Sequence, residues 1–486
     1  MRHKMKSNEN FYLYEDIAKK IANQISNGIL PPGEKLPSVR KLSKELGVSV
    51  STVVLSYISL ENQGLIESKP QSGFYVRNLT WKTLPENDVI NKSAVISRYE
   101  SGTLISDVHE FSKITEMVSL GAGTPADDVL PIKEFKKILI QISKKSLDAG
   151  LMFEYPPGNI GLRKEIAKQS INIGCNFNPE DIIVTTGALE GIQLSLKILT
   201  KPGDIVLTEA PTYYLLLELL EKLNLKILSV PTHSKYGIDI ELLESSLKKH
   251  KVATCLLYPT LNNPLGSIVP EESRKHIYSL ITKYNVPLME VNPYGELCYD
   301  KKPKAIKSFD NRSNVIYISS FSKVIAPGYR TGWMAPGKYY NELQKLQFLT
   351  SLSSPTITQL AIAEFLKKES YNRTIRNLRK TYDERTTFLG NLINQYFPAG
   401  TKFTKPQGGY YQWVELPENV NSTILQRQAL EENISIAAGE MFSSKKDFNN
   451  YIRLSCAFPN WSNEKVEKAM KILGMLIKQG TYVHPI

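Results

Sequence analysis

The sequence predicts a multidomain protein in which a small N-terminal domain of helices and a hairpin precedes a much larger α/β domain. Residues 13–60 contain three stretches with apolar residues at helical spacing, and a short hairpin pattern follows them. Beyond residue 115, runs of β-branched residues alternate with amphipathic stretches of helix length, which is typical of an open α/β sheet. The residues in between lack sustained periodicity and exceed the length of an ordinary loop. We therefore expect an N-terminal domain over residues 11–78, a linker over 79–114 and a second domain over 115–486.

The N-terminal domain is predicted to contain three helices. In the first, apolar residues recur at every fourth position: Leu13, Ile17, Ile21 and Ile25. The second helix should start near Ser38 and end at Gly47, with three residues facing inward: Val39, Leu42 and Leu46. Ser49 is then placed to cap a third helix, whose buried face carries Val53, Tyr57 and Leu60. The pattern then changes to a hairpin over residues 65–76, so the whole domain has the layout of a winged helix-turn-helix.

Composition and charge indicate a globular protein with anionic partners. The chain has 486 residues, of which 42% are hydrophobic and 22% are charged, so a disordered chain and a small disulfide scaffold are excluded. The net charge of +12 favours phosphates or nucleic acid as partners. The four cysteines are far apart and form no C-x-x-C pair, which predicts neither a zinc site nor disulfides and favours a reducing cytoplasm. No export signal or membrane anchor is expected.

Three motifs of the first domain occur in a fixed order: LPPGEKLPSVRKL, GVSVSTV and a wing that contains a glycine. Over nearly its whole length this segment resembles the DNA-binding domain of GntR-type bacterial regulators. The resemblance implies that Arg40 contacts phosphate or a base edge and that the start of the third helix meets the major groove. The residues implied in DNA binding are Arg40, Ser49, Ser51, Thr52, Gln71 and Gly73.

Elementary chemistry agrees with this role, because the first turn of a helix offers free backbone N–H groups and short hydroxyl side chains allow a close approach to phosphate. The alternative is that Ser49 is only a helix cap. Val50 stands where relatives often carry a polar or basic reader, which leaves its part in base recognition open.

The segment YISSFSKVIAPGYRTGW carries the chemistry of the second domain. A strand ends in serines, Lys323 follows, and Arg330 stands seven residues further on. A lysine in this setting suits a Schiff base to an aldehyde cofactor whose phosphate is held by Ser320, Ser322 and Arg330. Alone, the pattern also fits a surface lysine in a serine-rich turn.

Seven further segments accompany it: YPPGNIGLRKEIA, VTTGALEGIQLSL, EAPTYY, YPTLNNPLG, MEVNPYGEL, GGYYQWVEL and YIRLSCAF. In this order they resemble fold-type I aminotransferases that depend on pyridoxal 5'-phosphate (PLP), over roughly residues 115–480. The resemblance implies a phosphate site at the start of a helix, formed by Gly187, Ala188 and Leu189. It also implies that Tyr213 stacks on the pyridine ring, that Asn263 and Tyr294 bond its phenolic oxygen, and that Arg453 clamps a substrate carboxylate. No metal site is expected.

One position departs from the family pattern. Catalytic relatives place an aspartate two residues before the tyrosine that matches Tyr294, where it keeps the pyridine nitrogen protonated. This chain carries Asn292 there. A neutral amide cannot stabilise a pyridinium charge, so we expect PLP binding with poor transamination and leave enzymatic activity undecided.

A GntR-type head joined by a linker to an aminotransferase-like body resembles the MocR/GabR subfamily of bacterial transcriptional regulators. The resemblance implies a cytoplasmic homodimer that binds promoter DNA and senses PLP or a small amino compound. Two alternatives stay open: an active PLP-dependent aminotransferase that carries a DNA-binding head, and a sensor of PLP itself that needs no amine.

Overall fold

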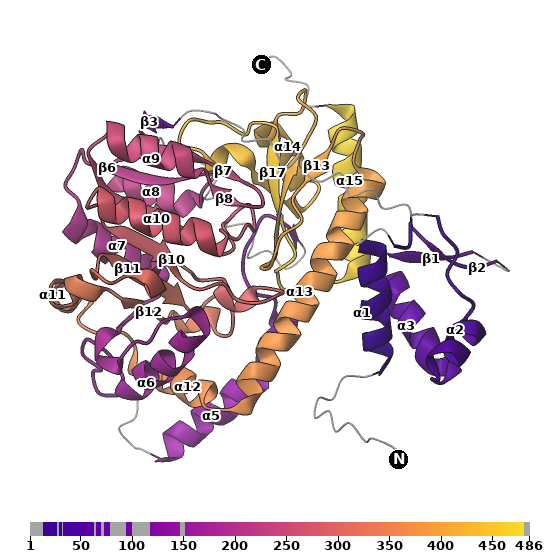
Figure 1. Cartoon of the computed structure of the whole chain (residues 1–486), viewed down its shortest axis with the longest axis horizontal. Coiled ribbons are helices and arrows are strands. Elements are labelled where there is room, and N and C mark those ends of the chain that lie inside the picture. Colours follow the sequence, from indigo (N-terminus) through magenta and orange to yellow (C-terminus); the bar gives the residue numbers. More distant parts are fainter. Residues whose placement is uncertain are drawn as a thin grey trace. The chain divides into compact units, whose positions relative to one another are not determined.

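We analysed a computed structural model of the chain, which describes residues 13–26, 29–31, 33–62, 65–69, 72–77, 94–99, 117–145 and 151–480 (Figure 1). The chain divides into two compact units: the first comprises residues 1–82 and 387–395, and the second comprises residues 83–386 and 396–486. They are described separately below as the N-terminal domain and the large domain.

The N-terminal domain has the predicted three helices and hairpin. Its elements are α1 (Leu13–Ser26), α2 (Val39–Leu46), α3 (Val50–Asn62), β1 (Ile66–Lys69) and β2 (Gly73–Val76). The two strands pair in antiparallel register from Ile66 with Val76 to Lys69 with Gly73. The core consists of residues from α1, α3 and the hairpin: Ile17, Ala18, Ile21, Leu36, Val53, Tyr57, Leu60, Leu65, Ile66 and Val76. The predicted inward face of α3 is therefore confirmed.

The predicted inward face of α2 is only partly right. Val39 and Leu42 are half-buried against the core, but Leu46 is exposed. Helix α2 ends directly after Leu46, at Gly47 with φ of 65°. The core beneath it is already filled from α1 and α3, so the last turn of α2 has no apolar surface to cover.

The predicted helix boundaries follow from side-chain and glycine caps. The Ser38 hydroxyl accepts a hydrogen bond from the Lys41 amide, and the Ser49 hydroxyl accepts one of 3.1 Å from the Thr52 amide. The left-handed Gly47 donates its N–H to the Ser43 carbonyl and closes α2.

The large domain is built on a sheet of nine strands among the described residues. In spatial order they are β3 (Val95–Ser97), β7 (Lys226–His233), β6 (Ile205–Ala210), β9 (Val252–Leu257), β10 (Leu288–Val291), β11 (Val315–Ser320), β12 (Gly332–Ala335) and β5 (Ile183–Thr185), with β8 (Gly237–Ile238) paired to β7. Strands β7, β6, β9, β10 and β11 are mutually parallel, and β12 is antiparallel to both its neighbours. Strand β5 thus runs in the same direction as β11, and these six carboxyl ends lie at one edge.

Strand β3 lies within the segment predicted as a linker. It pairs antiparallel with β7, from Val95 with Ser229 to Ser97 with Ile227. Three residues are too short to show a recognisable period, so the pattern of the sequence does not reveal this edge strand.

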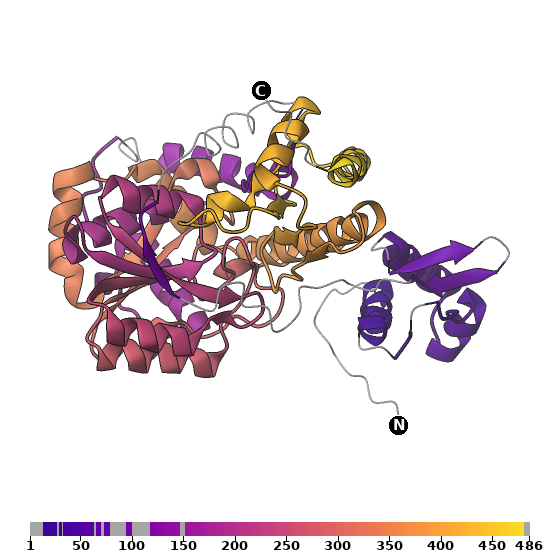
Figure 2. The same cartoon turned by 90° about the horizontal axis from the view of Figure 1, so that it is seen from above.

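Helices cover both faces of this sheet (Figure 2). Adjacent strand residues point to opposite faces: Val206, Ile227 and Ile316 face α7 and α8, whereas Leu207, Leu228 and Val315 face α9 and α10. These four helices are α7 (Ala188–Leu199), α8 (Tyr214–Lys222), α9 (Ile240–Lys249) and α10 (Glu271–Lys283). Near β5, β11 and β12 a third cluster is covered by α5 (Ile132–Lys145), α6 (Ile160–Ser170) and α12 (Thr356–Leu366).

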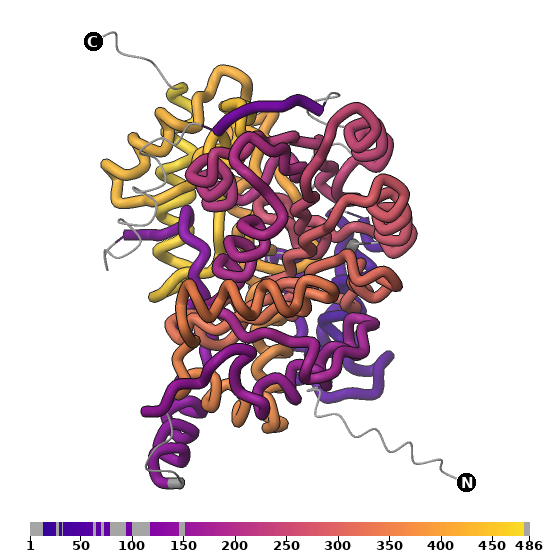
Figure 3. The backbone as a smooth tube through the Cα atoms, turned by 90° about the vertical axis from the view of Figure 1, so that its left-hand side faces the viewer, coloured from indigo at the N-terminus to yellow at the C-terminus, as the bar shows by residue number. Residues whose placement is uncertain are grey.

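The C-terminal part of the large domain forms a second, smaller sheet, whose strands Figure 1 draws in orange to yellow; Figure 3 traces the backbone of this part in the same colours. Its strands are β13 (Lys402–Phe403), β14 (Tyr411–Glu415), β17 (Tyr451–Ser455) and β16 (Ala437–Ala438). A separate parallel pair joins β15 (Ile434–Ser435) to β4 (Val118–Ser119). The remaining α-helices of the described residues are α11 (Tyr340–Ser351), α13 (Glu369–Tyr396), α14 (Ser422–Glu431) and α15 (Asn463–Gln479).

Candidate functional site

Most of the predicted PLP-site residues follow the carboxyl end of a strand of the large sheet. Tyr213 follows β6, Asn263 follows β9, and Asn292 follows β10 directly. Lys323 follows β11, and Gly187 follows β5. Because these strand ends meet at one edge, the topology brings together residues that are up to 136 positions apart in the chain, from Gly187 to Lys323.

One end of the site suits a phosphate group. Gly187, with φ of 87°, precedes α7 and brings no side chain to bond the first amides of that helix, those of Ala188 and Leu189. The Arg330 guanidinium lies so close to Gly187 that a Cβ there would be 2.6 Å from Nη2. Arg330 also donates a hydrogen bond of 2.9 Å to the Ser322 hydroxyl, and Ser322 contacts Ser320 at 3.1 Å. These residues together form a cationic cradle with free helix amides.

Lys323 lies deeper in the site, and its amine is buried. Nζ donates a hydrogen bond of 2.8 Å to the Gly123 carbonyl. Burial lowers the pKa of Lys323 below its ordinary value, and the positive charges of Arg453 and Arg330 lower it further. The deprotonated amine is the nucleophilic form, so this environment suits attack on an aldehyde.

Arg453 comes from β17 of the smaller sheet and is fully buried. Its guanidinium donates to the Asn263 side-chain oxygen at 3.0 Å and to the Gly121 carbonyl at 2.6 Å, neither of which carries a charge. Three aromatic rings surround it, with centroids at 4.3 Å for Tyr411, 5.0 Å for Phe442 and 5.7 Å for Tyr214. The positive charge is therefore buried without an anionic hydrogen-bond partner, as a carboxylate-binding site requires.

Asn292 is held against the sheet at the carboxyl end of β10. Its amide group donates a hydrogen bond of 2.8 Å to the hydroxyl of Tyr317, and its own backbone carbonyl accepts one from Ser319. Rotation of the amide would instead let Tyr317 donate to Oδ1 and leave Nδ2 free. In either orientation the group is neutral.

Glu290, an acidic residue two positions before Asn292, has a structural role. Both of its carboxylate oxygens accept backbone N–H bonds, from Ile306 and Lys307, and the buried Arg274 lies 3.6 Å away. The carboxylate is thus already paired, and it cannot replace an aspartate at position 292.

Tyr213 and Tyr294 also lie at this edge. Tyr213 precedes α8, with its ring 4.9 Å from that of Tyr214. Tyr294 is buried and packs edge-on against Tyr410 and Tyr411 at 5.8 Å and 5.9 Å. Burial raises the pKa of both hydroxyls, which keeps them protonated as hydrogen-bond donors.

The sequence reasoning missed three residues of the site: Gly121, Gly123 and Tyr411. A side chain at Gly123 would collide with the Tyr411 hydroxyl, so this glycine is needed for close approach. Burial alone would raise the pKa of Tyr411, but Arg453, Lys323 and hydrogen bonds from Tyr294 and Tyr410 lower it below its usual value. The sequence contains two features that could have indicated these residues: two glycines separated by one residue, and the adjacent tyrosines Tyr410 and Tyr411.

In the N-terminal domain, the predicted DNA-binding residues lie at three places. Arg40 is exposed on α2, and Ser51 is exposed in the first turn of α3. Ser49 caps α3, and its hydroxyl contacts those of Ser51 and Thr52 at 2.8 Å and 2.7 Å. Gly73, with φ of 110°, starts the second strand of the wing, and Gln71 lies outside the described residues. The cap and the residues predicted to meet DNA thus share the same helix turn.

The two domains define the class of protein: a winged helix-turn-helix DNA-binding regulator joined to an aminotransferase-like domain. Residues 13–76 match the gntR family of bacterial regulatory proteins, and residues 115–473 match class I and II aminotransferases. The uncharacterized HTH-type transcriptional regulator YdcR of Escherichia coli is 36% identical over 96% of this chain and 99% of its own length. The HTH-type transcriptional regulator NorG of Staphylococcus aureus is 28% identical over 92% of this chain and 100% of its own.

Two solved aminotransferase structures resemble more than three quarters of the chain. Pyrococcus horikoshii kynurenine aminotransferase has a TM-score of 0.73 at 28% identity, over 78% of this chain and 95% of its own. The α-aminoadipate aminotransferase LysN of Thermus thermophilus has a TM-score of 0.72 at 26% identity, over 79% and 96%. The chain belongs to the HTH-type transcriptional regulators in which a gntR-family domain is fused to a class I and II aminotransferase domain. This agrees with the resemblance to the MocR/GabR subfamily.

No helix in the described ranges is long and apolar enough to cross a membrane. Within the same ranges, no cluster of three or more His, Cys, Asp or Glu side chains could hold a metal ion.

Proposed function

We propose that the large domain binds PLP and a small amino compound, and that this binding changes how the regulator occupies promoter DNA. The observation that carries the proposal is a buried lysine amine among polar atoms without partners. Asn263 Nδ2, Asn292 Oδ1 and Arg453 Nε are buried with no hydrogen-bond partner among the residues described. Such groups are costly unless a ligand satisfies them.

The residues present fit PLP. The cradle of Gly187, Ser322 and Arg330 would hold its phosphate, Lys323 would face its aldehyde, and Asn263 and Tyr294 would donate to its phenolic oxygen. Tyr213 would stack on its ring. PLP would supply an aldehyde for amines and an electron-accepting ring.

Arg453 sets the class of effector. A buried guanidinium with an unsatisfied Nε favours a compound that bears a carboxylate, and the aromatic rings around it favour an apolar side chain beside that carboxylate. We therefore expect an amino acid or a related amino compound. An effect on DNA follows if this ligand binds one arrangement of the dimer more tightly than another.

Asn292 separates this role from that of an efficient aminotransferase. A neutral amide cannot stabilise a protonated pyridine nitrogen, so the carbanion formed in transamination would lose its main electron sink. The names of the full-length relatives also favour a regulator over the aminotransferase alternative.

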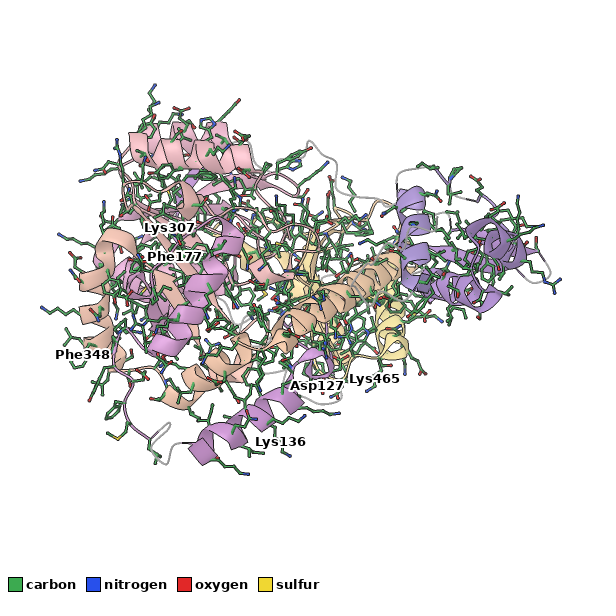
Figure 4. The ribbon with its side chains drawn as sticks, turned by 60° about the horizontal axis from the view of Figure 1, so that its bottom comes forward. Asp127, Lys136, Phe177, Lys307, Phe348 and Lys465 are labelled. Carbon is green, nitrogen blue, oxygen red and sulfur yellow. The ribbon has the colours of Figure 1, made fainter. Side chains whose placement is uncertain are left out.

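We also propose that the protein forms a homodimer. Six large apolar side chains are exposed on the segment before α6 and on α11: Leu151, Met152, Phe153, Tyr155, Phe348 and Leu349. The rings of Phe153 and Tyr155 lie 5.6 Å apart, and those of Tyr155 and Phe348 lie 6.0 Å apart, so these aromatics form one patch. Phe348 lies at the outer edge of α11 (Figure 4). A patch of this kind favours a protein interface, and a second copy is its proposed occupant.

The test is the visible absorption spectrum of the full-length protein with PLP, beside Lys323→Ala, before and after a panel of amino acids. We expect a band that requires Lys323 and shifts with one class of amino acid, together with a change in the affinity for promoter DNA. Asn292→Asp should add turnover. Steady release of keto acid by the wild type would instead make the protein an aminotransferase, and a response to PLP alone would make it a sensor of the cofactor.

A further inference from the structure

Helix α3 of the N-terminal domain exposes an aliphatic face. Val50, Val54, Leu55 and Ile58 are 49%, 38%, 48% and 43% exposed. At about 100° per residue these positions and Ser51 span roughly 140° of the helix circumference. The adjoining sector, at roughly 280° to 340° counted from Val50, carries the fully buried Val53, Tyr57 and Leu60. The exposed face is therefore separate from the core-facing side.

This face carries no positive charge. Helix α3 contains neither lysine nor arginine. Exposed cations are found instead on the elements before and after it: Lys35, Arg40, Lys41, Lys44 and Lys69. In a winged helix-turn-helix the second helix of the motif enters the major groove, and neighbouring elements contact the backbone. This distribution of charge favours phosphate contacts by α2 and the wing. Helix α3 would then contact the base edges in the major groove.

The hydroxyl groups at the start of α3 are already engaged with one another. The Ser49 hydroxyl accepts the Thr52 amide and contacts both the Ser51 and the Thr52 hydroxyls. The freest groups on the first two turns are therefore the methyl groups of Val50 and Val54. They lie four residues apart, and so one above the other on the helix.

B-DNA offers one apolar group to such methyl groups. The major-groove edge of thymine carries a C5-methyl group, whereas G·C pairs present only hydrogen-bond donors and acceptors there. Packing valine on a G·C edge would remove water from polar atoms without giving them new partners. Packing it on thymine buries apolar surface on both sides.

We propose that Val50 and Val54 read thymine methyl groups, so that each operator half-site carries thymines beneath the first two turns of α3. The proposal rests on the DNA-binding role of the N-terminal domain. It commits the aliphatic face to DNA rather than to a protein, because cations on the flanking elements complement a polyanion.

The test starts from selection of a binding site. Full-length protein is used to enrich duplexes from a random-sequence library, and the affinity of the enriched duplex is measured by fluorescence anisotropy. Each thymine is then replaced by uracil, which lacks only the methyl group. We expect enriched A·T pairs in each half-site and about a four-fold loss of affinity for each contacted methyl group removed, as one buried methyl group predicts.

Two variants assign the effect to the named residues. Val50→Ala and Val54→Ala should each lower the affinity for the thymine duplex and reduce its preference over uracil. Leu13→Ala removes a similarly exposed aliphatic side chain on α1 and should leave the preference unchanged. Circular dichroism checks that the N-terminal domain of each variant is folded.

The outcomes separate this inference from the proposed function. If folded full-length protein enriches no sequence and binds no duplex, the DNA-binding role itself fails. If it enriches a G·C-rich half-site, or tolerates uracil at every position, the methyl readout is wrong and DNA binding stands. If Val54→Ala changes the oligomeric state and not the preference for thymine, the face is a protein interface and the inference is overturned.

Discussion

Glu209 at the end of β6 is a carboxyl group buried at 1% exposure. One oxygen accepts the Tyr258 amide at 2.7 Å, and the other has no partner among the described residues. Burial raises its pKa from 4.5 to about 7. The folded state thus binds this proton more tightly than the unfolded state does, and stability falls as the pH rises from about 4.5 through 7.

We expect Glu209→Gln to remove that pH dependence. Between pH 5 and pH 8 the wild type should lose about 2.5 kcal/mol of unfolding free energy through this group, because each pKa unit corresponds to about 1.4 kcal/mol. The variant should lack this loss. Urea unfolding followed by tryptophan fluorescence reports it, since Trp333 and Trp413 are buried in the large domain. Glu241→Gln, at an exposed position on α9, is the control and should keep the slope of the wild type.

Tyr411 should act on Lys323 through charge. Burial lowers the pKa of Lys323, and the negative charge that Tyr411 gains when it loses its proton opposes that shift. Removal of the hydroxyl in Tyr411→Phe should therefore lower the pKa of Lys323 further. The visible band obtained with PLP should then form from a lower pH upward than in the wild type. An unchanged or higher midpoint would contradict the placement of negative charge on Tyr411.

At the scale of single residues, the sequence predicted which side chains form the site better than which backbone groups do. One segment of the sequence contains Ser320, Ser322, Lys323 and Arg330, so it was possible to predict from the sequence that they lie close together. The carbonyls of Gly121 and Gly123 could not be predicted from the sequence. They lie in a loop far earlier in the chain, and only the tertiary fold brings Gly121 to Arg453 and Gly123 to Lys323. Tyr411 stands in the segment GGYYQWVEL, but the sequence does not reveal its role, because its neighbours Arg453 and Lys323 belong to other elements.

At the scale of elements, the turn between α2 and α3 depends on one backbone conformation. Gly47 has φ of 65°, and an added Cβ would meet no atom within 4 Å. The cost of Gly47→Ala is therefore backbone strain alone, and we expect about 1 kcal/mol less stability for the N-terminal domain.

Gly47→Asn is the matched control, because asparagine adopts this conformation more readily, and it should lose less. Thermal unfolding of the N-terminal domain, followed by circular dichroism, measures both variants. An alanine variant as stable as the wild type would mean that the turn tolerates a second conformation.

The same turn shows why helix boundaries were predictable. Ser38, Gly47 and Ser49 are local signals, and each makes the expected cap. The burial of Leu46 and the existence of strand β3 were not predicted correctly. The local pattern of apolar residues does not show which positions the core can accommodate, and it does not show which short segment pairs with the edge of a sheet.

At the scale of the whole molecule, the apolar patch around Phe348 governs the proposed dimer. Phe348→Lys and Leu349→Glu place charge where a partner would bury apolar surface, and each should shift the protein toward monomer. Light scattering during size-exclusion chromatography measures the mass. Met475→Glu, a similarly exposed site on α15, should leave the mass unchanged. Wild-type protein that is monomeric at micromolar concentration would refute the assignment of this patch to a second copy.

The order of motifs along the chain was enough to predict the architecture, because two families with distinct signatures occupy separate stretches. What the ligand is and how the domains communicate depend on shapes and energies that no motif encodes.

The four cysteines provide a natural reporter. All are unpaired and buried in the large domain, and burial raises the thiol pKa to about 12 for Cys175, Cys255 and Cys456 and about 11 for Cys298. An aromatic disulfide reagent should react with none of them in the native protein, because thiolate is scarce and access is closed. No cysteine precedes Cys175, so unfolding of the N-terminal domain releases no signal. The rate of labelling therefore times the opening of the large domain alone, and a ligand that slows it reveals itself without any dye, tag or knowledge of the operator.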